Sequence, residues 1–171
     1  PALAVKTVSF DLAKGETLTL TYTVTLKDDS GTGNNAALTK TVTISITGTN
    51  DVPVITTQFG DSDQAFLTET NSGLMTQGTL TATDVDISDV LHASVISVNA
   101  SGAGIDHIIS QADLASFLVL GTNPIDSNST TSGTIFWTFD SKSEAFDFLP
   151  SGWESVINYT IRVEDGQGGY D

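Results

Sequence analysis

Apolar and polar residues alternate along much of the chain, which is the pattern of half-buried β-strands. The clearest run covers residues 17–26, where Leu, Tyr and Val side chains occupy one face and threonines the other. A turn-rich loop at 27–35 separates it from a return strand at 38–47. Residues 1–48 are therefore expected to be the C-terminal hairpin of a β-sandwich module.

The same two-residue period continues through the rest of the chain and predicts a second set of strands. These lie at 54–59, 78–83, 90–98, 134–139 and 155–163. One short helix is expected after Ser110, because Ser110 and Asp113 have the spacing of a helix-capping box before an apolar run. The predicted fold is all-β: an immunoglobulin-like or cadherin-like antiparallel β-sandwich with one short helix.

A short joint separates the two sets of strands. Gly48 ends the first set, and Pro53 has no N–H to donate to a sheet. The residue before a proline is held extended, so the joint is predicted to be stiff. Residues 49–53 are thus expected to be a linker between tandem modules, with the oxygen-bearing side chains of Asn50 and Asp51 at its centre.

The chain also contains an internal repeat about one sandwich domain long. Its motifs recur in the same order, and Tyr22 of the first copy aligns with Tyr159 of the second. Residues 54–171 are then a second module that lacks the counterpart of the 38–47 strand. An unpaired strand edge is a template for another strand. We therefore expect the 17–47 hairpin to pack against a neighbouring chain or to exchange into its incomplete sandwich.

Composition narrows the class of partner. The net charge is −15, with 21 acidic residues against 6 Lys and Arg, which argues against nucleic acid and anionic membrane surfaces. There is no cysteine, so disulfides and thiolate chemistry are excluded. No apolar run is long enough for membrane insertion. The acidic excess opposes compaction unless cations neutralise it.

The acidic residues are concentrated where a metal site can form. Asp84, Asp86 and Asp89 follow one predicted strand, and Asp165 follows another. Counting strand directions from the joint places both loops at the end of the sandwich where the chain enters, beside Asp51. Carboxylates gathered in this way repel one another, and a hard divalent ion relieves the repulsion. Ca²⁺ is favoured because it tolerates irregular oxygen ligands from flexible loops.

The predicted calcium ligands are Asn50, Asp51, Asp84, Asp86, Asp89 and Asp165. Two weaker candidates are Asp28, which aligns with Asp165 and would belong to the first module's own site, and Glu69, which would lie at the opposite end. Taken alone, an Asp-x-Asp pair is more often a solvated turn after a strand. Its coincidence with the joint and with the Asp165 loop favours a metal.

Enzyme chemistry has little support in the sequence. The two histidines, His92 and His107, stand in no catalytic or zinc-binding motif. Glu144 and Asp147 have the residue types of a glycosidase pair, but their segment is better explained as a turn that buries its phenylalanines. The glycines at 166–169 precede no helix and so form no phosphate cradle. The chain is expected not to be an enzyme.

Five segments of the chain resemble the VCBS-type repeats of bacterial RTX adhesins, which are large surface proteins exported by type I secretion. The segments are TGTNDVPVI at 47–55, LTATDVDISD at 80–89, TIFWTFD at 134–140, EAFDFL at 144–149 and YTIRVEDGQGG at 159–169. The chain is more distantly similar to cadherin repeats, whose Asn-Asp linker, Asp-x-Asp loop and late Asp correspond to Asn50-Asp51, Asp84-x-Asp86 and Asp165. Val52 stands where cadherins carry a further Asn, so the number of ions per joint is left open.

The resemblance implies a secreted, cell-surface module stiffened by Ca²⁺, which acts as a structural spacer in adhesion. Its partners would be the neighbouring repeats of the same chain. The alternative is a module with its own ligand, a glycan or a surface receptor protein, bound through residues 99–133. For a glycan, an exposed Trp153 would be the stacking residue.

Overall fold

The computed structural model describes residues 11–26, 38–126 and 130–171. The chain divides into two compact units, Pro1–Asn50 and Asp51–Asp171. The division falls inside the predicted 49–53 linker. Each unit is described by itself below.

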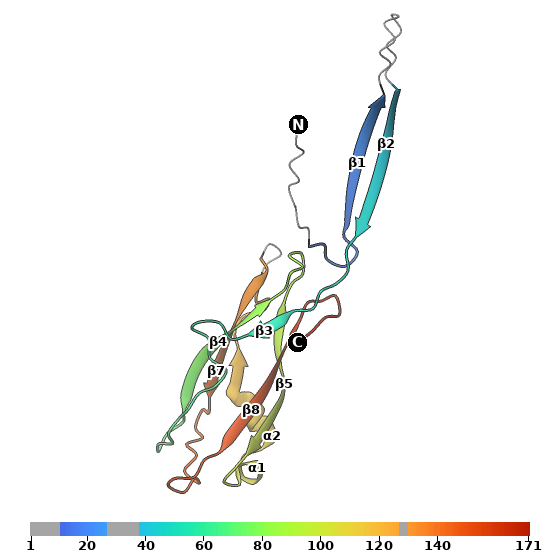
Figure 1. Cartoon of the computed structure of the whole chain (residues 1–171). Helices are drawn as coiled ribbons and strands as arrows, with labels where there is room; N and C mark the ends of the chain where they lie inside the picture. The colour runs from blue at the N-terminus through green and yellow to red at the C-terminus, as the bar shows by residue number, and fades with distance from the viewer. Residues whose placement is uncertain (1–10, 27–37, 127–129) are drawn as a thin grey trace, which may run out of the picture. The chain divides into compact units, whose positions relative to one another are not determined.

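The first unit contains the predicted hairpin. Strands β1 (Thr17–Leu26) and β2 (Leu38–Thr47) pair antiparallel along their whole length, with Tyr22 opposite Val42 (Figure 1). At the base of the hairpin, Gly48 N–H donates to the Glu16 carbonyl over 2.9 Å. A side chain at Gly48 would run into the Leu12 carbonyl, which explains the glycine at this position.

The second unit is a sandwich of two antiparallel sheets, as the alternating pattern predicted. One sheet has four strands in the order β3–β4–β7–β6, and the other pairs β5 with β8 (Figure 1). The strands are β3 (Val54–Thr56), β4 (Met75–Thr83), β5 (His92–Ser101), β6 (Leu118–Leu120), β7 (Ser132–Asp140) and β8 (Val156–Glu164). Among the described residues, strands β5 and β8 alone form the second sheet.

The core lies between these sheets in two adjoining clusters. Leu80 of β4, Ile135 of β7 and Val163 of β8 bring side chains from both sheets into the first cluster. The second cluster lies beneath the helices and includes Leu114 and Phe146. Burial of a large aliphatic side chain contributes about 1.5–3 kcal/mol, so these two clusters hold the sheets face to face.

The expectation of a single helix was incomplete. Helix α2 (Gln111–Phe117) begins where predicted, and the Ser110 hydroxyl accepts a hydrogen bond from Asp113 N–H over 3.1 Å. A second short helix, α1 (Ile105–Ile108), precedes it. It starts after Gly104 in the left-handed region and has no side-chain cap, so the sequence carried no capping signal for it. No helix in the described part of the chain has the length and apolarity needed to span a bilayer.

Candidate metal centre

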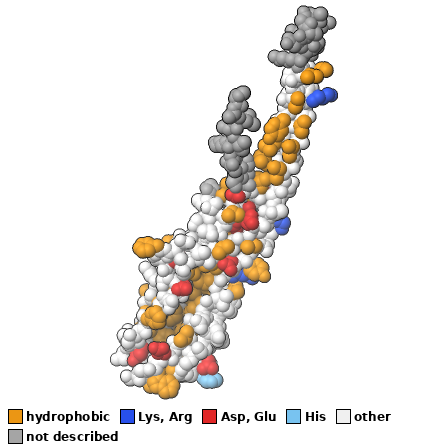
Figure 2. Space-filling view, viewed as in Figure 1, with side chains coloured by type: hydrophobic (Ala, Val, Ile, Leu, Met, Phe, Trp, Pro, Cys, Tyr) orange, Lys and Arg blue, Asp and Glu red, His pale blue; other side chains and the backbone are white. Residues whose placement is uncertain are grey.

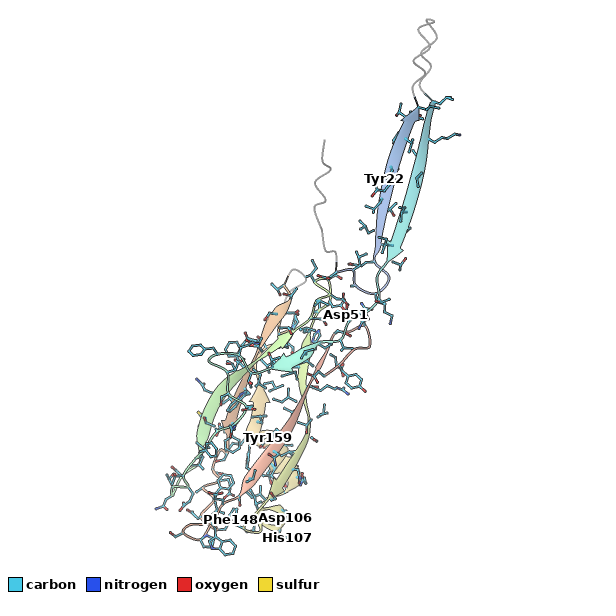
Figure 3. The ribbon with its side chains drawn as sticks, in the orientation of Figure 1. Tyr22, Asp51, Asp106, His107, Phe148 and Tyr159 are labelled. Atoms are coloured by element: carbon cyan, nitrogen blue, oxygen red, sulfur yellow. The ribbon has the colours of Figure 1, made fainter. Side chains whose placement is uncertain are left out.

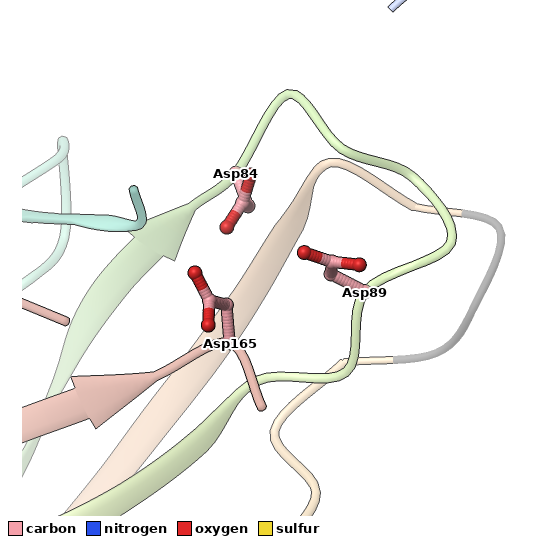
Figure 4. Close-up of side chains that lie close together, drawn as sticks. All are labelled: Asp84, Asp89 and Asp165. Atoms are coloured by element: carbon pink, nitrogen blue, oxygen red, sulfur yellow. The ribbon is translucent and has the colours of Figure 1, made fainter. Parts of the chain in front are cut away.

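Three aspartates from two loops meet at one end of the second unit. Asp84 directly follows β4, Asp89 ends the loop that leads toward β5, and Asp165 directly follows β8. Each offers a carboxylate oxygen within 4.8 Å of those of the other two (Figure 4). All three are buried, with 2–4% of their surface exposed. This buried cluster can hold a metal ion, and the sequence had predicted that these two loops would meet.

Asp84 and Asp86 are held by a turn built from their own loop. Asp86 N–H donates to Asp84 Oδ1 over 3.0 Å, and Asp89 N–H donates to the Asp86 carbonyl over 2.9 Å. The second carboxylate oxygen of Asp84 and Oδ1 of Asp86 are both buried without a hydrogen-bond partner among the described residues. Buried polar atoms are normally satisfied, so these two oxygens are candidate ligand atoms for a cation.

The Asp165 carboxylate is oriented by the glycine-rich turn that follows it. Its Oδ1 accepts three main-chain hydrogen bonds, from Gln167, Gly168 and Gly169, over 2.7–2.9 Å. Gly166 and Gly168 both have positive φ, which lets the chain curl around this oxygen. The carboxylate is thereby fixed before any ion binds.

The electrostatics of the cluster are unfavourable in the absence of a cation. Burial raises the pKa of the Asp84 carboxyl, and the nearby charges of Asp86, Asp165 and Asp51 raise it further, against the lowering effect of the Asp86 N–H bond. A raised pKa means that the folded unit disfavours the ionised form.

No basic side chain of the second unit offsets this charge in the described structure. Its Lys and Arg residues are Lys142 and Arg162. Lys142 donates to the Ser116 hydroxyl, while Arg162 pairs with Glu164 and lies over the ring of Tyr170. The described part of this unit therefore supplies no compensating positive charge to the cluster.

The other predicted ligands have different positions. Asp86 is 1% exposed and lies beside the three clustered aspartates, where its Oδ2 accepts a bond from Asp51 N–H. The side chain of Asp51 is exposed, but its charge acts on Asp84. Asn50 belongs to the first unit, so its role as a ligand remains a prediction. Glu69 is exposed and lines a cavity between the sheets. Asp28 lies outside the described residues.

Two contacts of the site had no signal in the sequence. The main chain of Thr131, before β7, accepts a hydrogen bond from Asp84 N–H over 3.0 Å. The second contact is the hydrogen bond that Asp51 N–H donates to Asp86 Oδ2. Both involve main-chain atoms, which residue types do not reveal.

The residues considered for enzyme chemistry form no comparable cluster among the described side chains. His107 Nε2 lies 3.5 Å from Asp106 Oδ2 on α1, and both side chains are exposed (Figure 3). Phe146 is buried and Phe148 half-buried, as the turn interpretation of their segment required. The chain matches no protein-family model, no curated protein and no solved structure.

Proposed function

We propose that the second unit is a calcium-binding module of a secreted bacterial surface adhesin and that it serves as a stiff spacer in adhesion. One observation carries the proposal. Four aspartates, each at most 4% exposed, lie together beside the first residue of the unit, and no basic side chain of the unit compensates them. A bound cation would relieve the repulsion in such a site and stabilise it.

Calcium suits this set of ligands better than other common ions. The cluster offers only oxygen ligands, whereas zinc prefers nitrogen and sulfur, so zinc is disfavoured. Its oxygens come from two separate loops, the one after β4 and the one after β8, so their arrangement is irregular. Ca²⁺ accepts six to eight oxygens in irregular geometry. Mg²⁺ requires a near-octahedral set and gives up its waters reluctantly. Asp84, Asp86, Asp89 and Asp165 are the proposed ligands from this unit, with water or further oxygens completing the shell.

The ion would couple folding to the extracellular environment. Its binding free energy adds to the stability of the folded state, by about 2.7 kcal/mol at a free concentration 100 times the Kd. It would also fix the 84–89 loop and, through Asp86, the main chain of Asp51 where the chain enters the unit. Resistance to bending there is what a spacer requires.

The proposal is tested by thermal unfolding of the whole chain in three parallel conditions, with CaCl₂, MgCl₂ or EDTA at about 2 mM. Calcium should raise the Tm of the second unit well above its value in EDTA, and magnesium should raise it less. Equal melting temperatures in calcium and EDTA would remove the basis for a structural ion.

One observation favours a second candidate, a glycan-binding module. Trp153 is 63% exposed, and an exposed indole is a platform on which a sugar ring can stack. A glycan array with the wild-type chain and the Trp153→Ala variant separates this function from that of a spacer.

A further inference from the structure

The acidic loop after β4 is attached at both ends to a later part of the chain. At its start, Asp84 N–H donates to the Thr131 carbonyl over 3.0 Å. At its end, both main-chain groups of Leu91 are bonded: its N–H donates to Asp126 Oδ1 over 2.8 Å, and its carbonyl accepts from Ile125 N–H over 3.0 Å. The loop that carries three of the proposed calcium ligands is therefore held between these two attachments.

The second attachment belongs to a short segment, residues 123–126, which we call the strap. Asn123 imitates a neighbouring strand, because its Oδ1 accepts from Ala93 N–H and its Nδ2 donates to the Ala93 carbonyl, both over 2.9 Å. Alternate residues of a strand direct their N–H and C=O groups to the same side. The strap thus fixes the main chain where β5 begins, at positions 91 and 93.

The strap is itself held by the core of the unit. Leu91 is completely buried, and Ile125 packs against the same core cluster. Gly133 of β7 passes so close to the strap that a β-carbon at this position would run into the Ile125 carbonyl. The strap is therefore packed against the body of the sandwich, which makes it a firm support for Leu91.

This support lies next to a proposed ligand. A single residue, Val90, separates Leu91 from Asp89. Consecutive Cα atoms are about 3.8 Å apart, so a displacement of Leu91 also displaces Asp89. Ca²⁺ binds its oxygens at about 2.3–2.6 Å, and groups that orient the ligands from outside the coordination shell typically change metal affinity by about 10–100-fold. Asp126 has this relation to the site, because it lies outside the three-aspartate cluster but holds the end of its loop.

Negative charge alone does not distinguish Asp126 from the other acids of the unit. Acidic side chains occur at several separate points on the face shown in Figure 2. The distinguishing feature is the main-chain hydrogen bond that Asp126 accepts two residues away from a proposed ligand. An asparagine at this position would offer an acceptor oxygen without the charge, so the effects of position and charge can be separated.

We propose that Asp126 is a positioning residue of the calcium site. It does not bind the ion. It holds the Leu91 amide and thereby fixes the end of the acidic loop from which Asp89 offers its carboxylate. A loop that is ordered in advance loses less conformational freedom on binding, which strengthens the binding. The inference rests on the calcium-binding function proposed above and adds to that site a residue from a segment that carries no ligand.

Calorimetric titration of the whole chain with CaCl₂ tests the proposal on three variants. Asp126→Ala removes the acceptor and should weaken calcium binding about 10–100-fold. Asp126→Asn keeps an acceptor oxygen and should stay within about threefold of the wild type. Asn123→Ala is the matched control, because it removes two bonds between the strap and β5 but leaves those to Leu91 in place. Its affinity should also stay within about threefold of the wild type.

Hydrogen exchange in EDTA gives a readout that does not involve calcium. The Leu91 amide should exchange faster in Asp126→Ala than in the wild type, and the Ala93 amide should do so in Asn123→Ala. Unchanged exchange at Leu91 in Asp126→Ala would overturn the proposal. Should Asp126→Ala fail to fold, the affinity of Asp126→Asn still decides, because a large loss there assigns the effect to charge.

Three results of the titration would also overturn the proposal. The first is an Asp126→Ala chain that binds calcium as tightly as the wild type. The second is an equal loss in Asp126→Ala and Asp126→Asn, which would indicate charge rather than position. The third is an equal loss in Asp126→Ala and Asn123→Ala, which would indicate general loosening of the strap. A wild-type chain that binds no calcium is a different result, because it contradicts the calcium site itself and the inference with it.

Discussion

The main-chain N–H of Asp51 donates a hydrogen bond to Oδ2 of Asp86 over 2.8 Å, across 35 positions of sequence. Asp51 is the first residue of the second unit, and Asp86 is buried in the acidic loop after β4. The bond links the entry of the chain to the candidate metal centre. An ion that orders Asp86 therefore orders the start of the unit as well.

Replacement of Asp86 should release the amide of Asp51. Asp86→Ala removes the acceptor, and we expect the exchange of the Asp51 amide hydrogen with solvent to accelerate about tenfold or more. Asp86→Asn keeps an acceptor oxygen and should preserve much of the protection. The amide of Leu91, bonded to Asp126 at 2.8 Å, is the internal reference. Unchanged exchange at Asp51 in Asp86→Ala would show that this bond does not hold the entry segment.

The calcium response should depend on the buried aspartates individually. Asp84→Asn keeps the size of the side chain but removes one charge from the cluster, so the Tm increase caused by calcium should shrink to a small fraction of the wild-type value. Asp106→Asn is the matched control, because Asp106 is on α1 and outside the cluster (Figure 3). Calorimetric titration should show the same contrast in affinity. An equal loss in both variants would point to a general charge effect.

The response of stability to pH should differ between EDTA and calcium. In EDTA, the folded-state pKa of Asp84 lies above its ordinary 3.8, chiefly because of burial. Between those two values the folded state holds a proton that the unfolded state has released. The contribution of Asp84 to the free energy of unfolding therefore rises as the pH falls from 7 into that window. With calcium bound the carboxylate stays ionised in both the folded and the unfolded state across that window, so its contribution should stay level there and decline only as the pH falls below 3.8.

The difference in unfolding free energy between the wild type and Asp84→Asn isolates this contribution. It can be measured by urea denaturation at several pH values, once in EDTA and once in calcium. A difference that does not vary with pH in EDTA would show that the Asp84 carboxyl is not perturbed in the folded unit.

The sequence predicted five of the six strands described in the second unit, all but β6, and the meeting of the 84–89 and 164–169 loops. Both followed from alternation, because the period-2 pattern fixes the inward face of a strand and the number of strands fixes the end at which each loop lies. Alternation does not determine the register in which neighbouring strands pair. Helix α1 and strand β6 are set by tertiary packing around Ile105 and Leu118 rather than by local signals. The hydrogen bond between Asp51 and Asp86 uses a main-chain N–H as its donor. Nearly every residue carries such a group, so the sequence does not indicate which one forms the bond.

Gly78 is required by its neighbour on the next strand. It lies opposite Trp137, whose ring occupies the space that a β-carbon at position 78 would need. Trp137 Nε1 also donates to the Ser62 carbonyl over 2.8 Å, which holds the ring in place. Gly78→Ala should cost about 1–3 kcal/mol, although alanine suits a strand interior better than glycine does.

Urea unfolding followed by Trp137 fluorescence, in a Trp153→Phe background, measures this cost. Gln77→Ala, at the exposed adjacent position, is the control and should stay within about 0.5 kcal/mol of the parent. A Gly78→Ala chain as stable as its parent would show that the indole can move aside freely.

Tyr159 should ionise at a higher pH than an ordinary tyrosine. Burial raises its pKa to about 12 from the ordinary 10.0, and its hydroxyl donates to the Leu114 carbonyl over 2.8 Å. Between pH 10 and 12 the folded state keeps a proton that the unfolded state loses. The stabilisation from Tyr159 is thus complete below pH 10 and declines as the pH rises toward 12. Because the ring is only half-buried, the decline should be about 1 kcal/mol rather than the full value of the shift.

Tyr159→Phe should abolish both the late step in the absorbance titration and this part of the alkaline destabilisation. A variant that keeps the late step would assign it to another tyrosine.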